Sequence, residues 1–251
     1  MSMSIFLFIP ARYNSSRLIG KPLLKINNKT IINHVFDNVS KLENIKNITI
    51  LTDDIRIKNE CKSFGANCEI ITDECLNGTD RIIKYLKKKN ITDGIIVNVQ
   101  GDEPFINYKN IQKAIDNFIE KKNTNPKMVC SSLYYETADL NEIKSRSRGK
   151  TVLDKDNNVM YCSRNIIPSS KKNEIIDNYK YKIHVGIFVF DCDYLLNYYC
   201  CENTELQLCE DIEWMKILEQ GFCMNCVKID THEIGVDTKE DYDYLKKKYE
   251  N

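Results

Sequence analysis

The chain alternates short apolar runs with amphipathic segments. The apolar runs have the length and composition of buried β-strands, and they cover residues 5–9, 48–51, 68–71, 95–99 and 128–133. The amphipathic segments place apolar residues at helical spacing, and they cover 31–42, 54–64, 79–89, 108–122, 205–220 and 238–249. Strands that alternate with helices predict an α/β fold with a mostly parallel sheet flanked by helices.

From residue 150 to 190 the pattern becomes β-rich. The stretches "KTVLDKDNNVMYCSR" and "YKIHVGIFVF" are rich in strand-forming residues, and the first is typical of a hairpin that turns at Asp156, Asn157 and Asn158. Neither an internal repeat nor a low-complexity linker interrupts the sequence. We therefore expect a single domain over 1–251, with 150–190 as a β-rich insertion or lobe.

Composition limits the classes of partner. Of the 251 residues, 42% are hydrophobic, and 36 basic residues balance 36 acidic ones, so no net charge favours nucleic acid or an anionic membrane. The first apolar run is too short to cross a bilayer and lacks the features of a signal peptide, which predicts a cytoplasmic protein. The eleven cysteines are irregularly spaced and favour reduced core thiols, and Cys223 and Cys226 lack the second pair that a zinc site needs.

Two polar sequences follow predicted strands, where open parallel sheets bind ligands. The loop "PARYNSSRLIGKPL" follows the first strand, and its Arg12, Arg17 and Lys21 can gather around a polyphosphate, although it lacks the Walker A spacing. The sequence "NVQGDEP" follows the strand at 95–99, and its Asp102 offers a hard oxygen ligand for magnesium. Taken singly, each also fits a solvated loop or an ordinary turn.

Three further polar residues stay ambiguous at this level. Asp237, in "GVDTKEDYDYL", precedes a predicted helix and fits either a metal ligand or an N-cap. Arg164, just past a strand, can pair with a carboxylate of a ligand or of the protein, and His184 lies within a strand, where histidine is usually structural.

Read together, these sequences resemble the 3-deoxy-manno-octulosonate (Kdo) cytidylyltransferases, or CMP-Kdo synthetases. The matching segments occur in the family's order, span nearly the whole chain, and are "IPARYNSSRLIGKPL", "NGTDRI", "VNVQGDEPFI", "KTVLDKDNNVMYCSRNIIP", "HVGIF" and "GVDTKEDYDYL". The resemblance implies a Rossmann-like nucleotidyltransferase fold, CTP and an acid sugar as substrates, Mg²⁺ as cofactor, and a homodimer with contacts through the β-rich segment.

The resemblance also implies roles for individual residues. The residues matching the triphosphate loop are Arg12, Ser15, Arg17 and Lys21. The residues matching the cytosine and ribose pocket are Gly78, Thr79, Arg81 and Gln100. Asp102 and Asp237 correspond to the magnesium ligands, and Arg17 and Lys21 complete the catalytic set. Arg164, His184 and Trp214 correspond to residues at the acid sugar.

Two positions depart from the family pattern and keep the acceptor open. Phe188 stands where tyrosine is common, and Trp214 replaces a glutamine expected near the sugar. The expected reaction is in-line attack of the sugar's 2-hydroxyl on the α-phosphorus of CTP, with release of pyrophosphate and no protein nucleophile. Kdo is the expected acceptor, and its 8-amino analogue or a nonulosonate is the alternative. The alternatives from other classes are a non-catalytic nucleotide-binding protein and a glycosyltransferase using "DCD" at 191–193.

Overall fold

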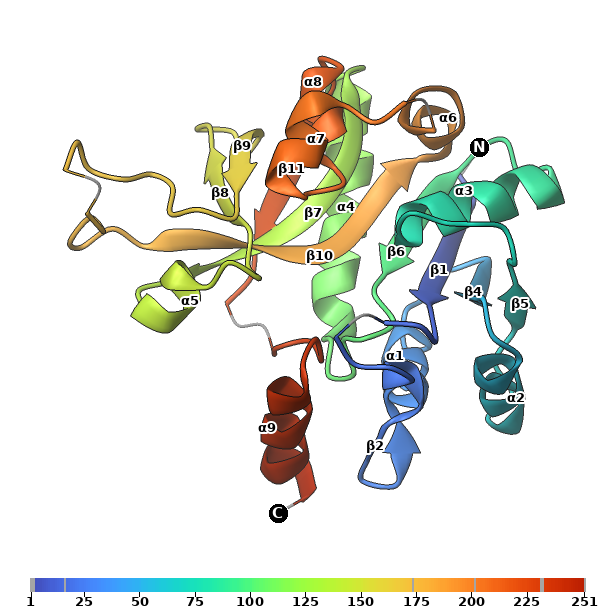
Figure 1. The fold of residues 1–251 in the computed structure, drawn as a ribbon. Helices are drawn as coiled ribbons and strands as arrows, with labels where there is room; N and C mark the ends of the chain where they lie inside the picture. Colours follow the sequence, from blue (N-terminus) through green and yellow to red (C-terminus); the bar gives the residue numbers. More distant parts are fainter. Residues whose placement is uncertain (1–2, 16, 173, 201, 231–232, 251) are drawn as a thin grey trace. The chain divides into compact units, whose positions relative to one another are not determined.

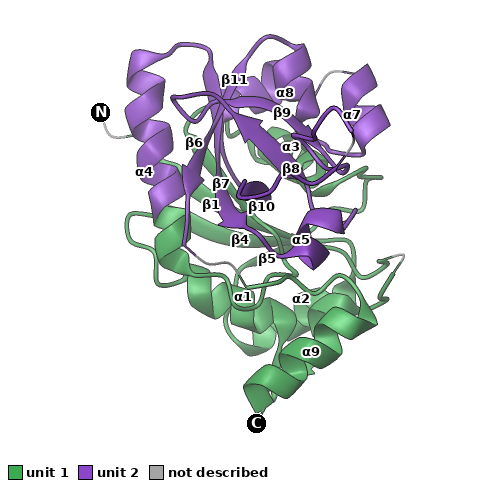
Figure 2. Cartoon of the chain, turned by 90° about the vertical axis from the view of Figure 1, so that its left-hand side faces the viewer, with its two compact units in different colours: residues 1–112, 233–251 green, residues 113–232 purple. Residues whose placement is uncertain are grey.

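The chain divides into two compact units. The computed structural model describes residues 3–15, 17–172, 174–200, 202–230 and 233–250. Unit 1 comprises Met1–Gln112 with Glu233–Asn251, and unit 2 comprises Lys113–His232 (Figure 2). The helix α4 (Tyr108–Thr124) crosses the boundary between them. The single domain over 1–251 stays a prediction.

Unit 1 is built on a parallel sheet. Its strands run in the order β6-β1-β4-β5, and their bounds are β1 Ile5–Ala11, β4 Asn47–Thr52, β5 Cys68–Ile70 and β6 Ile95–Val99. Every residue of β6 is buried, because a parallel sheet is covered on both faces. This explains why the strands of unit 1 read as continuous apolar runs, and their prediction is confirmed.

Helices and one short hairpin complete unit 1 (Figure 1). Their bounds are η1 Lys21–Leu23, β2 Lys25–Ile26, β3 Lys29–Thr30, α1 Ile31–Val39, α2 Ile55–Ser63, α3 Gly78–Lys89 and α9 Lys239–Glu250. Asp54 and Asn77 cap α2 and α3 by accepting from backbone N–H groups of the first turn. The helix α3 packs against β1, β4 and β6, so its first turn lies near the carboxyl end of β1.

The C-terminal helix α9 packs against the hairpin β2–β3. Tyr242 and Leu245 are buried in one cluster with Ile26, Ile31 and Val236. The Tyr242 hydroxyl also donates a hydrogen bond of 2.7 Å to the carbonyl of Lys25. Because Asp237 lies directly before α9, this packing also fixes the position of that carboxylate.

Unit 2 contains the β-rich part of the chain. Its strands are β7 Met128–Thr137, β8 Lys150–Leu153, β9 Val159–Ser163, β10 Tyr181–Asp191 and β11 Cys223–Lys228. The strand β7 pairs parallel with β11 and antiparallel with β10, whereas β8 pairs antiparallel with β9 and β10. The predicted hairpin is confirmed, and Asn157 takes a left-handed conformation in its turn (φ 63°).

The predicted helix over 205–220 is wrong as a single element. The structure has two short helices there, α7 (Glu205–Glu210) and α8 (Met215–Glu219). Asp211 ends the first helix in a left-handed conformation with φ 52°.

The remaining helices of unit 2 are α5 Leu140–Lys144, α6 Cys192–Tyr194 and the π-helix η2 Leu195–Tyr199. Asp191 caps α6, so the "DCD" sequence has a local structural role.

The cysteines are free thiols wherever the structure describes them. Those that are buried are Cys61, Cys68, Cys130, Cys162, Cys192 and Cys226. Cys200 and Cys209 are exposed, so the prediction of core thiols is wrong for these two; Cys201 lies outside the described residues. Across the described ranges, no helix is both long and apolar enough to cross a membrane.

The packing of α9 gives a first testable prediction. Leu245 is 0% exposed, whereas its neighbour Tyr244 is 51% exposed. Leu245→Ala should lower the free energy of unfolding by about 3 kcal/mol, because it leaves a cavity in the cluster. The control Tyr244→Ala should change it by less than about 0.5 kcal/mol. Urea unfolding measures both, and equal effects would contradict the docking of α9 through Leu245.

Candidate active site

Hydrogen bonds to Tyr13 hold the two ends of the loop after β1 together, and we call this point the neck of the loop. The Tyr13 carbonyl accepts hydrogen bonds from the backbone N–H groups of Ser15 at 3.0 Å and Gly20 at 2.9 Å. Gly20 has a positive φ of 70°, and a Cβ there would lie 3.3 Å from the Tyr13 ring. The loop therefore begins and ends close to Tyr13. Ser15 is buried within it, whereas Arg12 and Arg17 are exposed.

Asp53, at the end of β4, braces this neck. Its carboxylate accepts a hydrogen bond of 3.0 Å from the backbone N–H of Tyr13. The same carboxylate pairs with Arg81 at 3.5 Å, and the Arg81 guanidinium also donates to the carbonyl of Ile71 at 2.9 Å. The Arg56 guanidinium lies 3.4 Å from the centroid of the Tyr13 ring. Arg81 is thus a buried brace of the loop, and its contact with a nucleotide stays a prediction.

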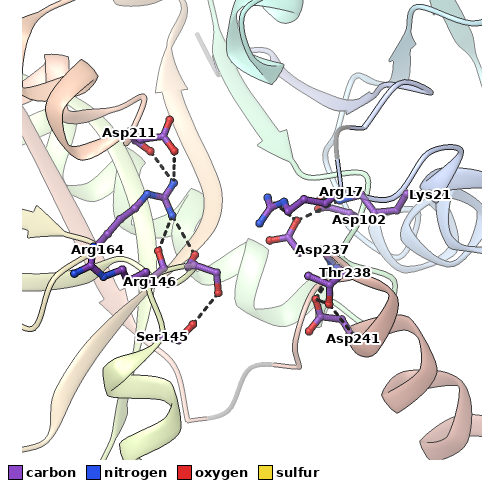
Figure 3. A network of polar contacts seen from close by, with 11 residues as sticks. Arg17, Lys21, Asp102, Ser145, Arg146, Arg164, Asp211, Asp237, Thr238 and Asp241 are labelled. Carbon is purple, nitrogen blue, oxygen red and sulfur yellow. Dashed lines mark hydrogen bonds and ion pairs between the residues drawn. The ribbon is translucent and has the colours of Figure 1, made fainter.

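Lys21 brings together two carboxylates from distant parts of the chain (Figure 3). Its Nζ donates to Asp102 at 2.6 Å and to Asp237 at 3.3 Å. Arg17 pairs with the same oxygen of Asp237 at 3.4 Å. The Lys21 side chain is 10% exposed, while those of Asp102 and Asp237 are 31% and 42% exposed. The four residues expected to form the catalytic set therefore do meet, at a place that solvent reaches from the acidic side.

The Asp237 carboxylate can pair with Lys21 and Arg17 because Thr238 and Asp241 cap α9 instead. The Asp241 carboxylate accepts from the N–H and hydroxyl of Thr238, at 2.8 and 3.0 Å, and from the N–H of Asp237 at 3.0 Å. The N–H of Asp241 in turn donates to the Thr238 hydroxyl at 3.2 Å. This is a reciprocal capping box. The interpretation of Asp237 as the N-cap is wrong, and its own carboxylate points to Lys21 and Arg17 (Figure 3).

Close packing of the backbone at Gly101 against β1 fixes the position of Asp102. A Cβ at Gly101 would lie 2.8 Å from the Pro10 carbonyl, so only glycine allows this approach to β1. The Asp102 carbonyl accepts a 2.8 Å hydrogen bond from the N–H of Val236, which ties the C-terminal segment to the same turn. Next to it, burial, followed by the charges of Asp102 and Asp237, raises the pKa of Glu103 to about 8. Negative charge is thus confined to the two partly exposed carboxylates.

The residues expected at the cytosine and ribose gather beside Pro10. The Asn98 amide donates to the Thr79 hydroxyl at 3.1 Å, and Gln100 donates to Asn98 at 3.5 Å. A Cβ at Gly78 would lie 2.8 Å from the Pro10 ring and 3.7 Å from Oε1 of Gln100. Gly78, Thr79 and Gln100 therefore lie together, and the absence of a side chain at Gly78 allows the first turn of α3 to pack closely against Pro10.

The donor set of Asp102 and Asp237 fits a magnesium ion that also binds phosphate. Both carboxylates lie within hydrogen-bond reach of one nitrogen, so one cation can replace the contact that Lys21 makes. No group of three or more His, Cys, Asp or Glu side chains suited to a metal occurs in the part of the chain that the structure describes. Mg²⁺ is commonly held by one or two carboxylates together with substrate phosphates and water, which is the set that these residues offer.

In unit 2, two of the three residues expected at the acid sugar, His184 and Trp214, form an aromatic group with Phe188. The His184 ring lies 4.8 Å from that of Trp214 and 5.4 Å from that of Phe188, between ring centroids. Trp214 and Phe188 are buried, and His184 keeps a little exposed surface although protein atoms enclose its ring. The two departures from the family pattern therefore both pack against His184.

The protonation of His184 follows from its contact with Ser132. The Ser132 hydroxyl has one proton, and the carbonyls of Val185 and Ile187, at 3.1 and 2.7 Å, are its acceptors. Nε2 of His184, 2.9 Å from the same hydroxyl, must then carry a proton and donate it. The Nδ1 atom of the neutral ring is left as an acceptor, suited to a hydroxyl of a ligand.

Arg164 is held by its own chain. Its Nε donates to the Glu210 carbonyl at 3.2 Å, and NH1 donates to the carbonyls of Arg146 and Ser147 at 3.1 and 3.3 Å. NH2 donates to the carbonyl and carboxylate of Asp211 at 2.7 and 3.2 Å (Figure 3). These contacts match all five N–H donors of a guanidinium. Contact of Arg164 with an acid sugar stays a prediction, and it competes with these bonds.

Sequence reasoning missed the residues that support the site. Asp53 follows a predicted strand in "LTDD", so its place at the carboxyl edge of the sheet was a usable signal. Lys150 starts a strand yet is 0% exposed, and Glu210 accepts from Ser163 and from the N–H of Arg164. Their partners are mostly backbone groups or distant residues, which leave no pattern in the sequence.

The fold and these groups define a nucleotidyltransferase. The chain belongs to the cytidylyltransferase family, whose model matches residues 6–233. It is 35% identical over 243 residues (96% of this chain, 92% of the relative) to 3-deoxy-manno-octulosonate cytidylyltransferase of Protochlamydia amoebophila. It is 36% identical over 237 residues (94% and 93%) to the protein of that name from Fusobacterium nucleatum. A structure of CMP:2-keto-3-deoxy-manno-octonic acid synthetase complexed with CTP is similar with a TM-score of 0.86 and 27% identity, covering 97% of each chain.

The surroundings of His184 predict a pH dependence of stability. Burial lowers the pKa of His184 from its ordinary 6.5 to about 3. Between these values the unfolded chain binds a proton that the folded protein does not bind. The free energy of unfolding should therefore fall with falling pH, by up to about 1.4 kcal/mol per pH unit from this residue.

Urea unfolding of the natural protein and of His184→Gln from pH 3.5 to 7 measures this contribution. The acidic groups are common to both proteins, so the difference between the two curves isolates His184. A difference that does not change with pH would mean that the histidine titrates normally in the folded protein.

Proposed function

We propose that this protein transfers CMP from CTP to the 2-hydroxyl of Kdo and releases pyrophosphate. The observation that carries the proposal is the meeting of Arg17, Lys21, Asp102 and Asp237 in unit 1. It occurs in a chain that is 35% identical, over nearly its full length, to a Kdo cytidylyltransferase. Two basic and two acidic groups at the edge of a parallel sheet suit a nucleoside triphosphate and its cation.

The basic residues act on the triphosphate. The acceptor oxygen forms a bond to the α-phosphorus, the bond to the bridging oxygen of the β-phosphate breaks, and the hydroxyl proton passes to solvent. Arg17 and Lys21 stabilise the charge on the phosphates and on the leaving pyrophosphate. The tight neck at Tyr13 and the brace at Asp53 hold the loop in one shape, so little ordering is needed when CTP binds.

Asp102 and Asp237 would hold magnesium, together with phosphate oxygens of CTP. The ion would supply charge neutralisation on the phosphates and acidify a hydroxyl next to it. Without CTP, Lys21 occupies the carboxylates and prevents their mutual repulsion.

The acid sugar is assigned to unit 2. We assign to Nδ1 of His184 a hydrogen bond from a sugar hydroxyl, beside the apolar surfaces of Trp214 and Phe188. Phe188 has no hydroxyl, and Trp214 has only an N–H donor, so these positions favour different polar groups from those that tyrosine and glutamine favour. This keeps the 8-amino analogue or a nonulosonate as a second candidate acceptor.

The assembly and location of the protein stay predictions. The homodimer rests on the resemblance alone, and so does the assignment of the β-rich segment at 150–190 as the contact. The cytoplasmic location rests on the composition and on the first apolar run.

An acceptor panel tests the proposed function. Pyrophosphate release from CTP with Mg²⁺ should occur with Kdo, and more slowly or not at all with 8-amino-Kdo and N-acetylneuraminate. Release with another acid alone would keep the reaction and change the acceptor. Binding of CTP without release for any acceptor would favour a non-catalytic nucleotide-binding protein and contradict the proposal.

A substitution tests the acidic pair. Asp237→Asn should lower kcat by on the order of 100-fold and raise the Mg²⁺ concentration needed for half-maximal rate, because one charged ligand is lost. The matched control is Asp243→Asn on the same helix, where the side chain is 57% exposed and pairs with Lys239. Initial rates at varied Mg²⁺ measure both variants, and equal magnesium curves for the two would remove Asp237 from the metal site.

A further inference from the structure

The ring of Tyr249, in the last turn of α9, stacks on the ring of Phe105. Their centroids lie 3.7 Å apart, and their planes are inclined by 16°. Both side chains are partly buried in unit 1, and both pack against the cluster that holds α9. Phe105 comes three residues after Asp102, in the segment that follows β6. The stack therefore joins the far end of α9 to the segment that carries one carboxylate of the acidic pair.

The hydroxyl of Tyr249 holds the segment that carries the other carboxylate. It donates a hydrogen bond of 2.8 Å to Oε2 of Glu233, which also pairs with Lys248 at 2.6 Å. Burial raises the pKa of Glu233, but the contacts with Lys248 and Tyr249 outweigh it, and the net pKa is below the ordinary value. Burial, followed by the bond to Glu233, raises the pKa of Tyr249 to about 12. Donor and acceptor are thus fixed at neutral pH, four residues before Asp237.

The two segments also meet beside the acidic pair itself. The N–H of Val236 donates a hydrogen bond of 2.8 Å to the carbonyl of Asp102, and Val236 is 0% exposed. The segments 102–105 and 233–237 are therefore joined twice. The backbone hydrogen bond joins them at one end, and Tyr249 joins them at the other.

A magnesium ion makes the separation of the two carboxylates important. Mg²⁺ requires near-ideal octahedral geometry with oxygens at about 2.0–2.1 Å. The ammonium of Lys21 is less demanding, since it contacts Asp102 at 2.6 Å and Asp237 at 3.3 Å. A segment that is held at one point can turn about it, whereas a segment held at two points keeps its direction. Loss of the second attachment should therefore weaken the binding of the metal more than it disturbs the contacts of Lys21.

We propose that Tyr249 is a positioning residue, which sets the separation of Asp102 and Asp237 for a magnesium ion by holding the segments 102–105 and 233–237 together. This rests on the proposed function, which gives the two carboxylates their role. Tyr249 acts through its ring and its hydroxyl, and the metal ligands remain the two aspartates.

Hydrogen exchange tests the attachment without substrate or metal. In Tyr249→Leu, the N–H of Val236 should exchange about 10-fold faster, because its bond to Asp102 loses the support of the second attachment. Tyr249→Phe keeps the ring and loses the hydroxyl, so it should accelerate this exchange by only about 3-fold. The control Tyr244→Leu, at a residue of the same helix that is 51% exposed, should leave the exchange unchanged.

The buried amides of β6 serve as the internal reference for exchange. Equal acceleration at β6 and at Val236 would indicate a general loss of stability and overturn the proposal. Unchanged exchange at Val236 in Tyr249→Leu would overturn it as well.

The magnesium dependence of the rate then tests the positioning role. Tyr249→Leu should raise the Mg²⁺ concentration for half-maximal rate about 10-fold and leave the KM for the acid sugar within about 2-fold. Tyr249→Phe should restore most of the natural magnesium dependence. A merely structural role would reduce the amount of active enzyme without moving the magnesium curve, and this result would contradict the proposal.

Binding of Mn²⁺ in the presence of CTP separates this inference from the proposed function. If the natural protein turns over no acceptor, the proposed function fails, but the paramagnetic resonance of free Mn²⁺ still measures how tightly the ion binds. Tyr249→Leu should weaken this binding about 10-fold, and Tyr244→Leu should leave it unchanged. Equal binding by the natural protein and Tyr249→Leu would overturn the inference.

Discussion

The structure of unit 1 depends on one lysine between two carboxylates. Lys21 lies at the end of the first loop, Asp102 follows β6, and Asp237 precedes the last helix, so one ammonium joins the beginning, middle and end of the chain. The Lys21 side chain is 10% exposed, and removing its partners would leave a largely buried charge. The rigid neck of the loop, the capping box of α9 and the glycine at 101 each serve to bring these three groups together.

The two units use opposite means to hold a buried cation. In unit 1, carboxylates surround Lys21, so the local charge is close to balanced and a metal ion can take its place. In unit 2, three carbonyls surround the buried Lys150, and their dipoles satisfy its N–H groups without cancelling its charge. The proposed function assigns the phosphates and their cation to the balanced cluster of unit 1.

The sequence predicted the strands well because parallel strands buried on both faces are continuous apolar runs, as at β1 and β6. It also predicted that the loop with Lys21 and the turn with Asp102 lie at the same edge of the sheet, since both follow parallel strands. It failed at Asp211, where apolar spacing continues through a left-handed residue. It could not identify Lys150 as a buried cation, because its acceptors are backbone carbonyls. Every residue has a carbonyl, and the direction of each depends on the fold.

The break in the helix at Asp211 affects the surroundings of His184, where the acid sugar is proposed to bind. A continuous helix over 205–220 would use the carbonyls of Glu210 and Asp211 in its own hydrogen bonds, and neither would be available to Arg164. The break frees them and orients the turn that leads to Trp214, whose ring packs against His184. Trp214 therefore packs against His184 from a backbone that hydrogen bonds to Arg164 hold in place, so under the proposed function its effect on the acceptor would come from shape and hydrogen bonding at His184.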